Sequence, residues 1–512
     1  MSHITKAASV LLARQSDDAE VFVVRRAEKL RFLGGFYAFP GGKVSPDDLT
    51  IAAANGPPEH SVDEKPDDRC ATAARELFEE TGVLVARRPD GAFPASGTVL
   101  HYLRRKLVAE EISFSQVLTR LGVAIHGEDF QFIGAITTPA FVPTRFDTAF
   151  FLVRAPENQA AEIWDGELDA GDWTTPLAVL DRWVKGECLV APPTLLILNA
   201  IRDGRIEDFV CRTRSLAEAQ SSAPVHSIYF TPGVQMIPLY TQALPPSTHT
   251  NAYLVGEESA YLIDPGTPKA EEQEILFSVL DGRIRNGLCL KAIVLTHHHP
   301  DHIGAANACA ARYRAPIWAH QWTAQRLAGR ISIASEIQDG DRLDLGTAPD
   351  GAKPWYMQAI HTPGHAPGHL VFYEPHYRIL LAADIVSTLS SIVIAPPDGD
   401  LIQYLDTLKR LQKYDCRLLL PAHGSATPRY QHVLEESIAH RLKREQQLMA
   451  ALDSTPRSVK DLAGELYKGL PEKMMRFAEL QILAGLDKLR REGHVESANG
   501  DEQQLWTKRA IS

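Results

Sequence analysis

Residues 296–304 read Thr-His-His-His-Pro-Asp-His-Ile-Gly. Within six positions this run holds four side chains able to bind a metal ion: His297, His299, Asp301 and His302. The preceding residues 290–295, Leu-Lys-Ala-Ile-Val-Leu, are mostly apolar and predict a buried strand. Imidazole together with carboxylate favours zinc, manganese or iron over calcium. The run therefore predicts a transition-metal site on the loop that leaves a rigid strand.

Three further donors downstream follow the same pattern. His365 stands in Thr-Pro-Gly-His after a predicted strand, and Asp384 follows the apolar residues 379–383. His423 stands in Pro-Ala-His-Gly after the apolar residues 418–420. Each donor comes at the C-terminal end of a short hydrophobic strand and before turn-forming residues. This repeated placement indicates one site, built at one rim of a sheet.

The order of these motifs, H-x-H-x-D-H, T-P-G-H, Asp and A-H-G, resembles the metallo-β-lactamase superfamily over roughly residues 235–430. The resemblance implies an αββα sandwich that binds two zinc ions, or manganese or iron in their place. Such a pair lowers the pKa of a bound water and generates hydroxide at neutral pH. It implies one metal at His297, His299 and His365, and a second at Asp301, His302 and His423, with Asp384 bridging them. Asp301 is also the catalytic candidate of this domain.

Three further residues of this part of the sequence bear on the resemblance. Ala383 stands where the family usually has glycine, which removes no ligand. Asp264, before Pro-Gly at a predicted strand end, resembles a carboxylate that orients a zinc-bound histidine, although a turn aspartate explains it nearly as well. His369 is a candidate for substrate contact or for a hydrogen bond within a turn.

A second motif lies near the start of the chain, where residues 73–83 read Ala-Ala-Arg-Glu-Leu-Phe-Glu-Glu-Thr-Gly-Val. In a helix, Glu76, Glu79 and Glu80 fall at i, i+3 and i+4 and share one face. Like charges packed in this way repel unless a cation neutralises them. Gly82 is placed to end the helix. The alternative is a solvated acidic helix face, which is common.

The run resembles the second half of the Nudix box, and the resemblance extends over about residues 4–212. It implies Mg²⁺ or Mn²⁺ bound by the three glutamates, with Glu79 as the catalytic candidate and Arg75 as a supporting or substrate-binding residue. The Gly41-Gly42 turn precedes a polar insertion, and Asp67 replaces the expected glutamate. Such an insertion resembles the subgroup that includes the coenzyme A diphosphatase type. Candidates for a further ligand or base are Glu128 and Asp129.

The C-terminal part of the sequence predicts three helices followed by two short strands around Asn499 and Gly500. This pattern resembles the winged helix found on metallo-β-lactamase-fold endoribonucleases of the β-lactamase-like protein 2 type. From Arg441 to Val495 there are eleven Lys and Arg against eight Asp and Glu. The excess of three positive charges is compatible with phosphate contact, but it is weak beside that of committed nucleic-acid binders. A helical cap beside the active site or a dimerisation element is an equal alternative.

The chain of 512 residues carries a formal net charge of −11 and 45% hydrophobic residues, enough for several buried cores. No apolar run reaches the roughly 18 residues that a membrane span needs, and the N-terminus has no secretion-signal pattern. Six cysteines without Cys-x-x-Cys spacing are typical of reduced thiols. We therefore expect a cytoplasmic protein that does not bind a membrane.

These observations predict a multidomain α/β and α+β protein. Its parts are a Nudix α/β/α sandwich at residues 4–212, a linker at 213–232, a metallo-β-lactamase αββα sandwich at 233–432 and a winged helix at 433–512. For the central domain two reactions stay open: hydrolysis of a phosphodiester in single-stranded RNA or a nucleotide, and thioester hydrolysis in the manner of glyoxalase II. For the first domain, a diphosphate such as a coenzyme A-like compound is the expected substrate. A non-catalytic binding protein is the third alternative.

Overall fold

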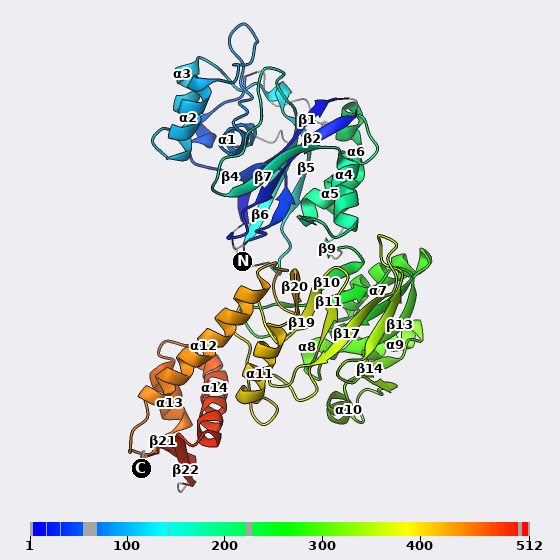
Figure 1. Cartoon of the computed structure of the whole chain (residues 1–512), viewed down its shortest axis with the longest axis vertical. Coiled ribbons are helices and arrows are strands. Elements are labelled where there is room, and N and C mark those ends of the chain that lie inside the picture. Colours follow the sequence, from blue (N-terminus) through cyan, green and yellow to red (C-terminus); the bar gives the residue numbers. More distant parts are fainter. Residues whose placement is uncertain are drawn as a thin grey trace. The chain divides into compact units, whose positions relative to one another are not determined.

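The computed structural model describes residues 4–16, 18–30, 32–54, 69–142, 144–221, 228–499 and 504–509. The chain divides into two compact units, Met1–Pro232 and Gly233–Ser512 (Figure 1). Asp67 and most of the predicted insertion lie outside the described residues. Among the residues that the structure describes, no helix combines the length and the apolar character that a membrane crossing requires.

The first unit is built on a mixed sheet in the order β5-β6-β1-β2-β3-β8, in which β4 also pairs with β1 and β7 with β2. Its strands are β1 (Ile4–Gln15), β2 (Ala19–Arg26), β3 (Phe36–Ala38), β4 (Gly41–Lys43), β5 (Gln131–Thr137), β6 (Arg145–Arg154), β7 (Leu168–Thr174) and β8 (Leu189–Val190). The central strand β1 is buried on both faces because helices cover both sides of the sheet.

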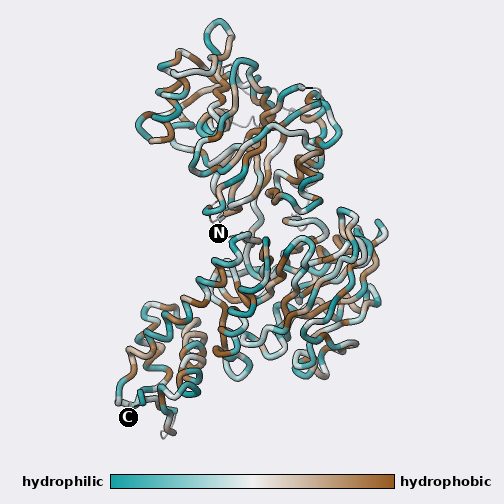
Figure 2. Tube along the Cα trace, viewed as in Figure 1, coloured by the Kyte–Doolittle hydropathy of each residue, from teal (hydrophilic) through white to brown (hydrophobic). Residues whose placement is uncertain are grey.

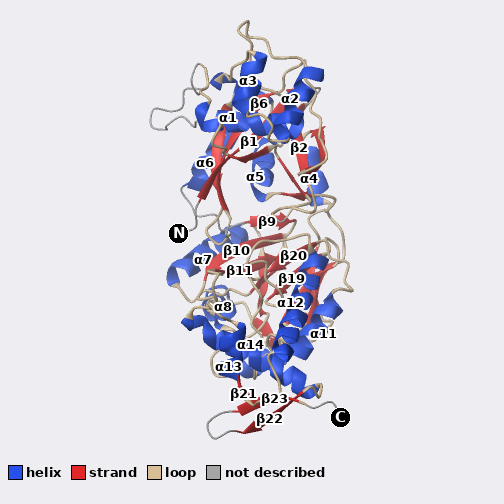
Figure 3. Ribbon diagram, turned by 90° about the vertical axis from the view of Figure 1, so that its left-hand side faces the viewer, coloured by secondary structure: helices blue, strands red, loops and turns tan. Residues whose placement is uncertain are grey.

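Alternation along β1 separates the two cores of this unit. Val10 and Leu12 pack toward one helical layer, and Leu11 and Ala13 pack toward the other. The first layer consists of α1 (Cys70–Thr81), α2 (Thr98–Val108) and α3 (Phe114–Leu121), and the second of α4 (Pro176–Val184), α5 (Pro192–Ile201) and α6 (Ile206–Ser221) (Figure 3). These layers confirm the expected α/β/α sandwich.

The expected linker at residues 213–232 differs from the structure at both ends. Helix α6 continues to Ser221, and β9 (Ile228–Thr231) already forms a strand. Residues 213–221 are polar and include alanine, leucine, glutamate and glutamine, all good helix formers. A polar segment of this composition can extend a helix without an apolar face, which is why composition alone indicated a linker.

The second unit contains two sheets. One runs in the order β15-β14-β13-β12-β11-β10 and the other β16-β17-β18-β19-β20. The strands of the first are β10 (Val234–Tyr240), β11 (His249–Val255), β12 (Ser259–Ile263), β13 (Cys289–Leu295), β14 (Ile317–Ala319) and β15 (Ser335–Glu336). Those of the second are β16 (Arg342–Gly346), β17 (Trp355–His361), β18 (Leu370–Glu374), β19 (Ile379–Ala383) and β20 (Leu418–Pro421). Hydrophobic residues gather along many of these strands (Figure 2).

Helices cover the outer faces of both sheets and complete the αββα sandwich. The first sheet packs with α7 (Ala270–Arg285), α9 (Ala306–Tyr313) and α10 (Gln321–Leu327) in one core. The second sheet packs with α11 (Leu401–Leu411) and the start of α12 (Tyr430–Ala450) in another core. The short helix α8 (Pro300–Ile303) follows β13 and carries the end of the histidine-rich run.

The C-terminal part has the expected winged-helix order, with α13 (Val459–Leu466) and α14 (Glu472–Arg491) after α12. Its strands β21 (Arg457–Ser458), β22 (Val495–Asn499) and β23 (Gln504–Lys508) pair in the order β21-β23-β22. The sequence did not predict β21. The expected boundary at residue 433 falls inside α12, whose Leu434 packs under the second sheet and whose Leu448 packs in the winged-helix core.

The shared helix α12 allows a matched test of stability. Leu434 is fully buried, whereas Leu442 of the same helix is 44% exposed. We expect Leu434→Ala to lower the free energy of unfolding of the second unit by about 2–5 kcal/mol because it leaves a cavity. Leu442→Ala should change it by no more than about 0.5 kcal/mol. Urea unfolding followed by circular dichroism measures both, and equal effects would contradict this placement of α12.

Candidate metal centres

Strand ends bring the predicted ligands of the second unit to one rim. β12 and β13 run parallel, and so do β19 and β20. His297 therefore follows β13, Asp384 follows β19 and His423 follows β20 on the same side of the sandwich. β17 is antiparallel to β18, which is antiparallel to β19, so the loop with His365 also leaves at this rim.

The first ligand set consists of three converging imidazole nitrogens. The Nε2 atom of His297 lies 3.0 Å from Nδ1 of His299, which lies 2.9 Å from Nε2 of His365. Nitrogens bound tetrahedrally to zinc at 2.0–2.1 Å are about 3.3 Å apart, close to this spacing. Lone pairs held this close repel, and a cation between them removes the repulsion. These three residues therefore fit a metal ion.

The second set consists of Asp301, His302 and His423, whose ligand atoms also lie close enough for one ion. The Nε2 atom of His423 lies 3.4 Å from Oδ2 of Asp301. The Nε2 atom of His302 is buried without a hydrogen-bond partner. Such an unsatisfied buried atom is costly unless an ion or water satisfies it.

Asp384 lies between the two sets. Its Oδ2 atom is 3.6 Å from Nε2 of His302 and 3.6 Å from Nε2 of His365. Its Oδ1 atom is 3.2 Å from Nε2 of His423. One carboxylate thus reaches ligands of both sets, which is the arrangement that a bridging ligand needs.

The ring nitrogens that face away from the centre are hydrogen-bonded, which fixes the ring orientations. Nδ1 of His302 donates to Oδ2 of Asp264 over 2.8 Å. Nδ1 of His423 donates to the His249 carbonyl over 2.9 Å, and Nδ1 of His365 donates to the Val393 carbonyl over 2.8 Å. Bonds of this kind set the tautomer and leave Nε2 free to bind a metal.

Asp264 supports two ligands at once. It accepts hydrogen bonds from the backbone N–H and the hydroxyl of Thr296, at 2.8 and 2.6 Å, in addition to that from His302. The Thr296 hydroxyl in turn lies 3.0 Å from Nδ1 of His297. Asp264 is also near enough to His297 and His302 to count as a ligand. Because three donors already occupy its oxygens, it orients these rings instead.

His369 lies behind the ligands and is fully buried. Its Nδ1 atom donates to the hydroxyl of Thr362 over 2.7 Å, and its Nε2 atom accepts from the backbone N–H of Asp384 over 3.2 Å. The structure therefore places it as a support for Asp384 rather than in contact with substrate. Ala383 has φ +43°, a left-handed conformation that costs a non-glycine residue about 1–2 kcal/mol, which explains why glycine is usual there.

In the first unit, two of the three glutamates of α1, Glu76 and Glu80, lie against the glycine turn. Oε2 of Glu80 accepts a hydrogen bond from the N–H of Gly41 over 2.9 Å. A Cβ atom on Gly42 would stand 2.4 Å from the carboxylate of Glu76, so a side chain there would displace this carboxylate. The turn thus reaches the acidic helix face despite the long insertion between them in the sequence.

Arg75 organises these carboxylates together with a residue that the sequence did not reveal. Its guanidinium donates to Oε2 of Glu79 over 2.8 Å and lies 2.9 Å from Oε1 of Glu76. It also forms two hydrogen bonds, of 2.8 and 3.0 Å, with the buried carboxylate of Asp48. Asp48 belongs to the polar insertion that follows the Gly41-Gly42 turn, and only the fold shows that it is buried.

Three family models match this chain in turn. They are the NUDT19 Nudix domain at residues 59–201, the metallo-beta-lactamase superfamily at residues 246–423 and the beta-lactamase associated winged helix domain at residues 458–506. The chain contains a Nudix domain, a metallo-β-lactamase domain and the associated winged helix. Both hydrolase families depend on divalent metals, so the protein is a metal-dependent hydrolase.

Similar proteins carry different names. The lactamase-like protein adaB of Aspergillus niger is 26% identical over 272 residues, which cover 50% of this chain and 80% of that protein. The beta-lactamase-like protein 2 homolog of Caenorhabditis elegans is 26% identical over 255 residues, 48% of this chain and 81% of that protein. The atrochrysone carboxyl ACP thioesterase of Emericella nidulans is 27% identical over 207 residues, 40% of this chain and 61% of that protein.

Charge balance in the metallo-β-lactamase domain fits metal binding. Burial and the neighbouring His365 lower the pKa of His299 to about 3, so its ring is neutral, as a ligand must be. Burial also lowers the pKa of His423, but the Asp384 and Asp301 carboxylates together outweigh it and raise the pKa to about 10. Without a metal, a proton on His423 compensates these carboxylates, and a bound cation takes over that role.

In the Nudix domain the carboxylates themselves have raised pKa values. Burial raises the pKa of Glu76 to about 7 and that of Glu80 to about 8. Repulsion from Glu79 adds to the shift of Glu76, and repulsion from Glu76 adds to that of Glu80. Glu167, which the sequence did not indicate, also repels Glu79 and Glu80. Asp129, by contrast, is held by Arg87 at 2.6 Å. Glu167 is therefore a better candidate than Asp129 for the further carboxylate.

Removing the charge of Asp264 tests the support of the ligands. We expect Asp264→Asn to weaken zinc binding about 10- to 100-fold because His302 and Thr296 lose their anionic acceptor. Asp406→Asn, on the exposed face of α11, is the control and should leave affinity unchanged. Competition with a chromophoric chelator measures both, and unchanged zinc affinity in Asp264→Asn would argue against this role.

A single added methyl group tests the Nudix carboxylates. We expect Gly42→Ala to weaken Mn²⁺ binding at least about tenfold because the new Cβ atom displaces the Glu76 carboxylate. Gly464→Ala, where a Cβ atom meets open space, serves as the control. Electron paramagnetic resonance of free Mn²⁺ gives both affinities. Equal binding by the two variants would show that Glu76 does not hold the ion.

Proposed function

We propose that the metallo-β-lactamase domain is a dinuclear phosphodiesterase and that its substrate class is single-stranded RNA. The observation that carries this proposal is the convergence of two ligand sets on Asp384. Two metals in these sets, zinc or alternatively manganese or iron, supply an activated water and a clamp for phosphoryl oxygens. The protein orients the ligands, through Asp264 and the carbonyls of Val393 and His249.

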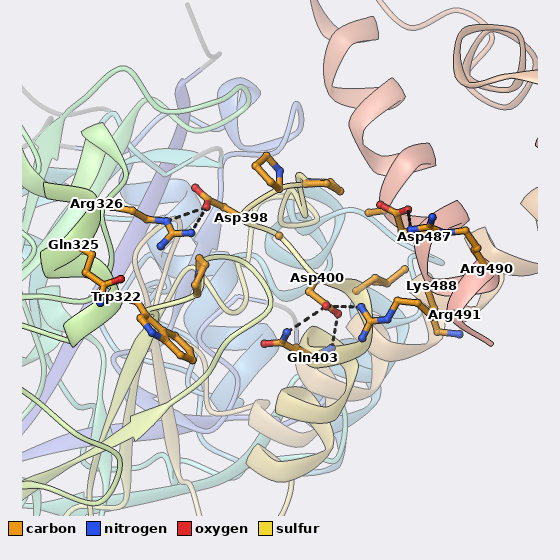
Figure 4. Close-up of a pocket in the computed structure, with 16 residues that line it drawn as sticks. Trp322, Gln325, Arg326, Asp398, Asp400, Gln403, Asp487, Lys488, Arg490 and Arg491 are labelled. Atoms are coloured by element: carbon orange, nitrogen blue, oxygen red, sulfur yellow. Dashed lines mark hydrogen bonds and ion pairs between the residues drawn. The ribbon is translucent and has the colours of Figure 1, made fainter. Parts of the chain in front are cut away.

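A cavity of about 550 Å³ beside this centre supports an anionic substrate. Asp398 lines it and accepts a hydrogen bond of 3.0 Å from His298, which stands between two metal ligands in the sequence. Four cationic side chains also line it: Arg326, Lys488, Arg490 and Arg491 (Figure 4). Three of them come from α14, so the winged helix contributes much of the positive charge.

The same cavity offers a surface for a base. Trp322 lines it and is 38% exposed, and stacking of unpaired bases on aromatic rings is a common feature of single-strand binding. The cations now pair with carboxylates such as Asp398 and Asp400. These ion pairs are partly exposed to solvent, so phosphate groups can compete for the cations.

Thioester hydrolysis is the second candidate. A relative named as an acyl-carrier-protein thioesterase is about as similar to this chain as the β-lactamase-like protein 2 homolog is. A dinuclear centre can polarise a carbonyl as well as a phosphoryl oxygen. The cationic winged-helix face favours the phosphodiester, because it supplies contacts that an acyl group cannot use.

For the Nudix domain we propose Mg²⁺- or Mn²⁺-dependent cleavage of a diphosphate in a coenzyme A-like compound. Glu76, Glu79 and Glu80 would hold the ion, and hard carboxylates with substrate phosphates are the ligands that such ions prefer. Arg75 keeps Glu76 and Glu79 in place through its contacts with Asp48. The proposed partners of this protein are therefore a small-molecule or nucleotide substrate for the Nudix domain and single-stranded RNA for the metallo-β-lactamase domain.

The cysteines support a reducing compartment. All six are free thiols in the structure, and Cys70, Cys188 and Cys309 are buried. Proteins with many unpaired cysteines are typical of the cytosol. We propose the cytoplasm as the location of this protein.

One screen separates these reactions. Purified protein is incubated with 5′-labelled single-stranded RNA, an acyl thioester and coenzyme A, next to the variants Asp301→Ala and Glu79→Gln. We expect RNA cleavage to fall about 100-fold in Asp301→Ala only, and coenzyme A cleavage to fall in Glu79→Gln only. Thioester cleavage without RNA cleavage would replace the first proposal by the second candidate. RNA cleavage that survives in Asp301→Ala would refute the assignment to this centre.

A further inference from the structure

The segment between β19 and α11 connects the metal centre with the winged helix. On the metal side, the carbonyl of Val393 accepts the hydrogen bond from Nδ1 of the ligand His365. A few residues further on, Asp398 accepts from His298, and two nitrogens of Arg326 hold its other oxygen at 2.9 and 2.6 Å (Figure 4). The orientation of one predicted ligand therefore depends on where this segment lies.

On its other side, the same segment is held by helices α12 and α14. Arg441 of α12 donates to the carbonyl of Ile392, and Gln481 of α14 donates to the carbonyl of Ile394 over 3.2 Å. The two side chains also bind each other, with Nη1 of Arg441 donating to Oε1 of Gln481 over 2.6 Å. These contacts flank Val393 immediately on both sides.

Alternation explains why the two sides are coupled. The carbonyls of Ile392 and Ile394 accept hydrogen bonds from the helices, while that of Val393, between them, accepts one from His365. Fixing the two outer peptide groups fixes the one between them. Ile394 is fully buried and Ile392 nearly so, which leaves the segment little freedom to turn.

Arg441 is suited to such a role because it is only 7% exposed. A buried guanidinium needs acceptors, and the Ile392 carbonyl and the side-chain oxygen of Gln481 are among those of Arg441. Its guanidinium carbon also lies 5.3 Å from the ring centre of Tyr404. A displacement of the segment between β19 and α11 would therefore cost free energy, because it would leave the buried charge of Arg441 without an acceptor.

We propose that Arg441 and Gln481 are positioning residues for the metal ligand His365, so that the winged helix sets the metal affinity of the neighbouring domain. This inference rests on the proposed metal centre and deepens it. The route runs from the two side chains to the peptide groups around Val393, and from the Val393 carbonyl to the His365 ring. The winged helix then has a role in the active site besides any contact with substrate.

The test measures zinc affinity by chelator competition in the full chain. We expect Arg441→Met and Gln481→Met each to weaken binding of zinc about 10- to 100-fold, the usual effect of removing support behind a ligand. Arg441→Lys keeps a donor for the Ile392 carbonyl and should recover part of the affinity. Arg476→Met, which alters an exposed arginine of α14, is the control and should bind like the unaltered protein.

Two measurements distinguish positioning from general stabilisation. In the Co²⁺-loaded protein, the visible spectrum should change in Arg441→Met and Gln481→Met, because the His365 ring turns. In a His365→Ala background, the same substitutions should no longer affect affinity, since the ligand through which they act is gone. Should Arg441→Met fail to fold, Gln481→Met carries both measurements.

The outcomes against the proposal are separable. If the unaltered protein binds transition metal and both methionine variants bind it equally well with an unchanged spectrum, the inference is overturned and the proposed centre stands. If affinity falls by the same factor with and without His365, the two residues do not act through that ligand. If the unaltered protein binds no transition metal, the proposed centre itself fails, and the inference with it.

Discussion

The fold of the second unit must hold several metal-binding groups together at one rim of the sandwich, although these groups repel one another. Three imidazole nitrogens, of His297, His299 and His365, meet at 2.9–3.0 Å. The carboxylates of Asp301 and Asp384 stand within 4 Å of His302 and His423. Without a cation, a proton on His423 compensates the nearby carboxylates, which raise the pKa of that ring. The surrounding structure must therefore keep the groups together, and much of it performs that task.

The two hydrolase domains keep their metal-binding groups together by different chemical means. In the metallo-β-lactamase domain, backbone carbonyls and Asp264 hold the far side of the imidazole rings, which suits a transition metal. In the Nudix domain, Arg75 holds negative carboxylates from the side, which suits a hard cation that also binds phosphate. Each set of ligands is thus matched to a different class of ion, and one chain can hold two independent hydrolytic sites.

The sequence predicted the features that arise within a few residues. The candidate ligand His297 could be predicted because a hydrophobic strand precedes it. The shared face of Glu76 and Glu80 could be predicted because helical spacing depends only on residues close in sequence. Asp48 and Gln481 were not predictable, since their roles come from partners at sequence separations of 27 and 87 residues. The domain boundary predicted at residue 433 falls inside helix α12. This helix packs in two cores, so no change in composition separates the two domains there.

The presence and spacing of the two metals is the central claim, and anomalous X-ray diffraction from crystals of the full-length protein tests it most directly. Data collected at the absorption edge of the bound metal should show two peaks about 3.5–4 Å apart. One should lie among His297, His299 and His365 and the other among Asp301, His302 and His423, with Asp384 between them. A single peak would contradict the dinuclear centre, and the absence of any peak in protein prepared with zinc would contradict the account as a whole.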